Sequence, residues 1–181
     1  MYLLDLEGDV KAAAAPVRGV EVEDPESFME GLRAKAAKVV LQALDARYVA
    51  DINHLWAVVR QAWKADKRGV SKVRFDLDIL LRLACDSRLT HALKTVGLKK
   101  GVLDVIFVAV GRGEPLQRSV EILGRMGDVS NDLLQPTSEK EAFLRRYHSI
   151  SDLALQSILL KQERLASILA ERAAVALSGR R

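Results

Sequence analysis

The sequence has little of what small secreted or metal-stabilised proteins depend on. Its 181 residues include one cysteine and three histidines. No disulfide framework can therefore form, and no clustered Cys/His set offers a structural zinc site. A single cysteine is usual in a reducing intracellular compartment. These absences predict a cytoplasmic protein.

Long hydrophobic runs are also missing. No apolar stretch approaches the roughly 18–20 residues that cross a bilayer, and the start at residues 1–7 is acidic, without the basic region of a signal peptide. We therefore expect no membrane partner. Hydrophobic residues make up 49% of the chain, too much for a disordered protein. The length predicts a single domain over residues 1–181.

Charge is distributed unevenly along the chain. Residues 1–30 hold two basic and eight acidic residues, a net charge of −6, whereas residues 60–100 hold eleven basic and four acidic residues, a net charge of +7. A basic block of this kind attracts phosphate groups or an acidic protein partner. It is equally typical of a solvated, salt-bridged surface.

Hydrophobic periodicity predicts a mixture of strands and helices. Expected strands are 2–7, 17–22, 38–44, 75–84, 102–110 and an edge strand at 132–135. Expected helices are 25–37, 52–67, 88–96, 114–126 and a long last helix at 151–177. The segment 75–84 is assigned to a strand because large apolar residues alternate along it.

Capping residues mark where several helices begin. Asp24 and Asp51 precede the first two helices, Ser87 precedes the short one, and Ser138 with Glu141 forms a capping box. Strands and helices do not alternate strictly. This order predicts an α/β (α+β) fold with a central mixed β-sheet flanked by helices and a long C-terminal helix.

The chain shows no arrangement of side chains that would carry a reaction. His54, His91 and His148 lack metal-site spacing, and Cys85 has no evident histidine partner. The turn at 111–113 has two glycines between a strand and a helix, but Leu116 stands where a dinucleotide fold needs a third glycine. We expect no enzymatic activity, no cofactor and no small-molecule substrate. A degenerate nucleotide-binding enzyme that uses this turn is the less favoured alternative.

One central pattern resembles the CGI-type kinase-binding subunit of the KEOPS complex, the TPRKB family. Its helix has a histidine near the start, an acidic-Ile-Leu segment follows, and a short helix ends in glycine. The pattern consists of Ala50-Asp51-Ile52-Asn53-His54-Leu55-Trp56-Ala57, Leu77-Asp78-Ile79-Leu80-Leu81-Arg82, and Leu89…Ala92-Leu93-Lys94…Val96-Gly97, followed by the strand 102–110. The order of elements agrees with the family over nearly the whole chain.

The resemblance implies an α/β, non-catalytic subunit that binds the small atypical KEOPS kinase (Bud type, PRPK in animals). KEOPS makes threonylcarbamoyl-adenosine in tRNA, and archaeal relatives of this subunit bind the tRNA 3′ CCA end. The family residues carry over as His54, Ile79, Leu80, Arg82, Ala92, Lys94 and Gly97.

The chain departs from the archaeal pattern just before the short helix. Relatives tend to have Ser-Gly-x-Arg-Gln-Ile, whereas this chain has Ala84-Cys85-Asp86-Ser87-Arg88-Leu89. Cys85 therefore takes the glycine position, and the arginine is displaced by one residue to Arg88.

Two sets of residues are expected to contact partners. Basic side chains of the central block are expected to bind tRNA: Arg82, Arg88, Lys94, Lys99 and Lys100, with Lys64, Lys67 and Arg68 as an extension. Apolar side chains left over after the core is filled are expected to bind the kinase: Leu89, Leu93, Leu153 and Leu160. The alternative function is an independent nucleic-acid-binding domain without a kinase partner.

Overall fold

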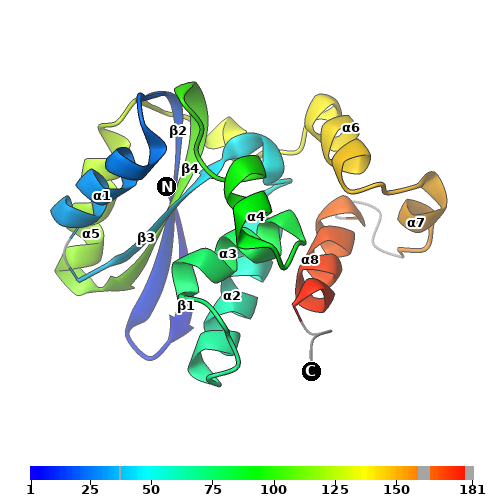
Figure 1. Ribbon diagram of the computed structural model, residues 1–181, viewed down its shortest axis with the longest axis horizontal. Coiled ribbons are helices and arrows are strands. Elements are labelled where there is room, and N and C mark those ends of the chain that lie inside the picture. The colour runs from blue at the N-terminus through cyan, green and yellow to red at the C-terminus, as the bar shows by residue number, and fades with distance from the viewer. Residues whose placement is uncertain (37, 159–163, 178–181) are drawn as a thin grey trace.

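The computed structural model describes residues 1–36, 38–158 and 164–177. Within these residues the strands form one sheet with helices on both faces (Figure 1). The strand order is β1-β2-β4-β3, and the short β5 pairs with β2. The strands are β1 Tyr2–Glu7, β2 Val10–Val22, β3 Val40–Asp45, β4 Gly101–Arg112 and β5 Asp128–Val129.

The helices connect these strands and extend beyond the sheet. They are α1 Pro25–Lys35, α2 Ile52–Lys67, α3 Phe75–Ala84, α4 Leu89–Thr95, α5 Gly113–Gly124, α6 Ser138–Tyr147, α7 Asp152–Gln156 and α8 Arg164–Ala176. Two 3₁₀ turns, Ala46–Tyr48 and Asn131–Leu134, follow β3 and β5. None of the described helices is both long and apolar enough to cross a membrane.

The combination of strands and helices confirms the expected α/β class, but the neighbouring strands are all antiparallel rather than mixed. Strands β2 and β3 run in the same direction, as two strands joined by one crossover helix do, because both are antiparallel to β4. However, β4 comes later in the chain and inserts between them. The parallel pair that the strand–helix–strand order suggests is therefore never formed.

Each face of the sheet has its own core. Helices α2, α3 and α4 cover one face, on which Leu55, Ile79 and Ile106 are buried. Helices α1 and α5 cover the other, around Phe107 and Leu123. Because successive strand residues point to opposite faces, the run Ala12 to Ala15 in β2 contributes small side chains to both cores.

The assignment of 75–84 to a strand is wrong, because this segment is helix α3. Nine of its ten residues are buried. A helix buried on all sides has no polar stripe, so its sequence carries no helical period. The four-residue spacing of Asp78 and Arg82, whose side chains form an ion pair at 3.1 Å, is the helical signal that the alternation concealed.

The backbone conformation at Cys85 explains why the archaeal pattern has a glycine at this position. It ends α3 with φ 50° and ψ 37°, the left-handed conformation that favours glycine at a helix C-terminus. A side chain at this position costs on the order of 1 kcal/mol relative to glycine. The thiol is partly buried, and burial raises its pKa to about 11.

Several other sequence expectations also differ from the structure. The segment 132–135 lies mostly in a 3₁₀ turn rather than a strand, since Leu133 and Leu134 fit into the core as a turn. Helix α6 is capped by Thr137, which accepts from the Lys140 amide, so Ser138 is already inside the helix. Arg88, with no side-chain cap bond, takes the cap position expected for Ser87.

The expected long last helix is described as two helices, α7 and α8. Residues 159–163 between them lie outside the described part of the chain. Helix α8 packs on α2 and α3, where Gln61 donates to the Ala170 carbonyl at 2.9 Å. Arg82 donates to the Ala173 carbonyl at 3.5 Å.

Two histidines are buried in this fold. His54 lies in the first turn of α2 and its Nδ1 accepts from the Ala50 amide at 3.2 Å. His148 ends α6. Burial lowers the pKa of His54 to about 3 and that of His148 to about 4. Both side chains are therefore neutral in the folded protein near neutral pH.

We predict that acidification from pH 7.5 to pH 5 destabilises the protein. The unfolded chain takes up protons on these histidines below about pH 6.5, while the folded chain does not until pH 3–4. The stability is therefore complete above pH 6.5 and falls as the pH drops, by about 2 kcal/mol per buried histidine at pH 5. Urea unfolding at both pH values measures the change.

His148→Gln is expected to show a smaller pH dependence than wild type. Equal free energies of unfolding at the two pH values in the wild type would contradict the prediction.

Candidate partner-binding surface around helix α4

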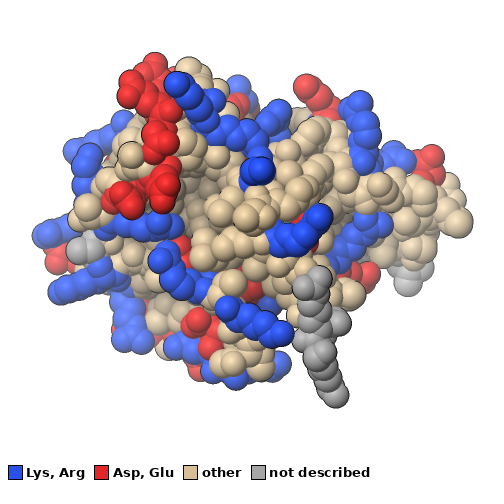
Figure 2. All heavy atoms as spheres, viewed as in Figure 1, with Lys and Arg blue, Asp and Glu red and all other residues tan. Residues whose placement is uncertain are grey.

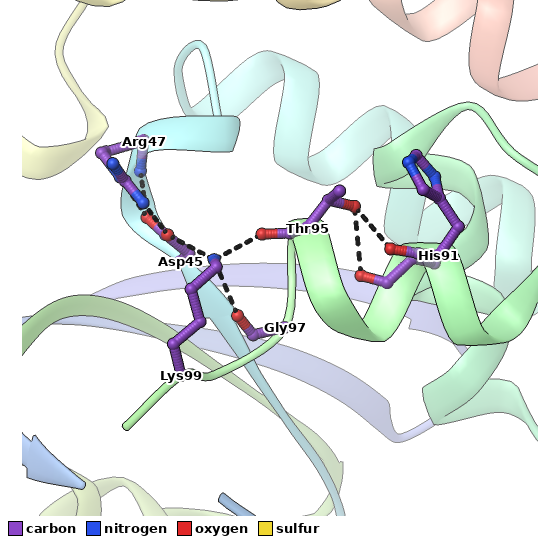
Figure 3. A network of polar contacts seen from close by, with 7 residues as sticks. Asp45, Arg47, His91, Thr95, Gly97 and Lys99 are labelled. Carbon is purple, nitrogen blue, oxygen red and sulfur yellow. Dashed lines mark hydrogen bonds and ion pairs between the residues drawn. The ribbon is translucent and has the colours of Figure 1, made fainter. Parts of the chain in front are cut away.

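Helix α4 is joined to the sheet by Lys99. The Lys99 ammonium donates to the carbonyls of Thr95 at 2.5 Å and Gly97 at 3.4 Å, which lie at the end of the helix (Figure 3). It also pairs with the Asp45 carboxylate of β3 at 2.9 Å. A cation at this position is favourable for the C-terminal dipole of the helix.

Asp45 is the buried acid of this network, with 2% of its side chain exposed. Burial alone would raise the pKa of its carboxyl. The hydrogen bonds from Arg47 and Lys99 outweigh burial and hold the pKa below its ordinary value. Arg47 binds both carboxylate oxygens, at 3.1 and 2.8 Å. The carboxylate is therefore charged and held by two cations.

Gly97 is required by a close approach at the end of α4. A Cβ atom at this position would lie 2.6 Å from the Leu93 carbonyl oxygen. Only glycine allows the chain to turn from α4 towards β4 at this distance. The glycine of the sequence pattern at this position therefore has a structural reason.

The structure separates the five expected tRNA-binding cations. Lys94 and Lys100 are exposed. Arg88 is exposed but binds Asp86 through two hydrogen bonds, and this contact lowers the pKa of Asp86 to about 2. Lys99 forms an ion pair with Asp45, and the buried Arg82 forms one with Asp78. The three extension residues at the end of α2 are exposed: Lys64, Lys67 and Arg68.

The expected kinase-binding leucines also differ in their surroundings. Leu93 and Leu153 are 43% and 77% exposed. Leu89 is partly buried against the core. Leu160 lies outside the described residues. Leu93 on α4 and Leu153 on α7 belong to different parts of the molecule, so they are not one surface (Figure 1).

The acid that anchors α4 was not identified from the sequence. Asp45 and Arg47 belong to no recognisable sequence motif. Their role in holding α4 follows only from the contact of β3 with the loop after α4. The expected turn at 111–113 is instead a direct junction, in which Gly111 and Arg112 end β4 and Gly113 begins α5. Within the described residues, no three His, Cys, Asp or Glu side chains are grouped to hold a metal ion.

Comparison with known proteins gives the family. Residues 20–167 match the family model described as kinase binding protein CGI-121. The chain belongs to this family. No curated protein matches the chain.

Most residues of the family pattern lie in the core of the structure. Of the seven carried over, His54, Ile79, Leu80, Arg82, Ala92 and Gly97 are buried. Only Lys94 is exposed. The pattern therefore mostly encodes the packing of α2, α3 and α4, and one position remains for a partner.

We predict that Lys99→Ala destabilises the protein by about 1–3 kcal/mol, because the buried Asp45 loses one of its two cations. Lys100→Ala is the matched control and should change stability by less than about 0.5 kcal/mol. Chemical denaturation compares the two variants. Equal stabilities would show that Lys99 does not anchor the helix.

Proposed function

We propose that this chain is the non-catalytic accessory subunit of the cytoplasmic KEOPS complex, which binds the atypical Bud-type kinase and recruits tRNA by its 3′ CCA end. The observation that carries the proposal is the family match over residues 20–167. The match makes kinase binding the property of the family, and the KEOPS kinase and tRNA are the partners implied by the sequence resemblance.

The exposure of two of the expected lysines supports tRNA binding at this surface. Lys94 lies on α4 and Lys100 precedes β4, and both are exposed. Among the described residues, no ion pair engages either side chain. Lysines of this kind contact phosphates and release counterions. Arg88 can join them only if it leaves Asp86.

We predict that the chain and the Bud-type kinase of the same organism co-elute as a stable complex after co-expression. The chain alone should not hydrolyse ATP. Size-exclusion chromatography and a phosphate-release assay measure the two properties. If the chain binds tRNA but does not bind the kinase, the independent nucleic-acid-binding domain is favoured, and ATP hydrolysis that is lost in Gly113→Ala would favour the nucleotide-binding enzyme.

We predict that the double variant Lys94→Glu/Lys100→Glu binds tRNA at least tenfold more weakly while its kinase binding is kept. The slope of log affinity against log salt should become shallower by about 0.7 per lost phosphate contact. Filter binding at several salt concentrations measures both effects. Removal of the CCA end should weaken binding to the wild type.

Lys35→Glu/Arg125→Glu is the matched control for this experiment. Both residues are exposed, they lie on or just after α1 and α5 on the opposite face of the sheet, and the change in net charge is the same. If both double variants lose tRNA equally, the effect is one of net charge. If neither loses it, the lysines do not bind tRNA.

A further inference from the structure

A groove lies beside the candidate surface, between α1, α3 and α4. Its volume is about 460 Å³. Apolar side chains from three elements and the following loop line it: Met29 of α1, Leu77 and Leu80 of α3, Leu93 of α4, and Leu98. Leu93 is the most exposed of these, at 43%. Figure 2 shows uncharged atoms filling the centre of this face of the molecule.

The two arginines at the groove share one buried carboxylate. Arg33 and Arg74 both line it, and both bind the buried carboxylate of Asp76, at 3.0 and 2.6 Å. The Asp76 carbonyl accepts from Gln42 of β3 at 2.9 Å. This arrangement holds α1 and the start of α3 in place and makes the groove a preformed feature.

The acids at the groove are not neutralised. Glu26 and Glu30 of α1 line it and are exposed. Within the described residues no ion pair engages either carboxylate. Figure 2 shows acidic side chains gathered at the upper left, over the region of α1. With Asp76 counted, three carboxylates stand against the guanidinium groups of Arg33 and Arg74, so the groove has a net charge of −1 beside its apolar floor.

Leu153, the other exposed leucine, lacks these surroundings. It lies on the five-residue helix α7, and its neighbour Asp152 is paired with Arg145. The cavity next to the residues that precede α7 is lined largely by polar residues, among them Arg145, Arg146 and Ser149. A single exposed leucine without an apolar cavity is common on protein surfaces.

We infer that the α1/α3/α4 groove is the docking site for the kinase, which inserts an apolar side chain flanked by basic residues. The inference rests on the proposed function for the identity of the kinase and adds the surface and its chemistry. A central apolar anchor in a pocket with a charged rim is the usual form of a protein-binding hot spot. The unpaired glutamates attract the basic flank and speed association.

Leu93→Glu tests the anchor. We expect binding of the Bud-type kinase, measured by biolayer interferometry, to weaken at least tenfold, with a melting temperature that confirms folding. Leu153→Glu is the matched control and should bind within twofold of wild type. Glu26→Lys/Glu30→Lys, which changes only exposed side chains, should slow association several-fold and leave dissociation nearly unchanged.

The outcomes separate the surface from the function. If wild type binds the kinase and both Leu93→Glu and the glutamate variant bind equally well, the groove is not the docking site and the proposed function stands. If Leu153→Glu alone loses binding, the kinase docks at α7. If sedimentation shows a dimer of this chain that Leu93→Glu dissociates, the groove binds a second copy instead. Failure of the wild type to bind the kinase overturns the proposed function itself.

Discussion

The antiparallel pairing of β2 with β4 is the constraint on which the rest of the structure depends. It runs from Val10 opposite Arg112 to Val22 opposite Gly101. The strands are central in the sheet, so each must be covered on both faces. The four alanines of β2 are short enough to let helices approach from either side. The partner strand supplies the larger side chains, Ile106 and Phe107, one to each core.

Two buried aspartates, one on β3 and one on α3, hold the helices around the edge strand β3. Asp45 receives Arg47 and Lys99 and so fixes the end of α4. Asp76 receives Arg33 and Arg74 and so joins α1 to the start of α3. A buried charge is tolerated only where such partners satisfy it. The same contacts shape the groove and the lysine surface beside it, so binding surfaces and stability share their anchoring groups.

These ion pairs reduce the number of positive charges that the central basic block, residues 60–100, offers to a partner. The sequence gathers eleven cations between residues 60 and 100. Arg74, Arg82, Arg88 and Lys99 are committed to acids. Fewer positive charges are therefore available to a partner than the sequence suggests. The available charges at α4 and in the loop that follows it are those of Lys94 and Lys100. The acidic N-terminal block keeps Glu26 and Glu30 available at the groove.

The sequence by itself determined the class of fold, the family, and the helices whose caps and apolar stripes are local, such as α2 from Asp51 to Lys67. Local patterns carry such elements because neighbouring residues decide them. Only the tertiary structure decided that 75–84 is a helix, because burial on every side removes the periodic signal. It also decided which cations are free and where Leu93 lies, because ion pairs and grooves join elements that are distant in the chain.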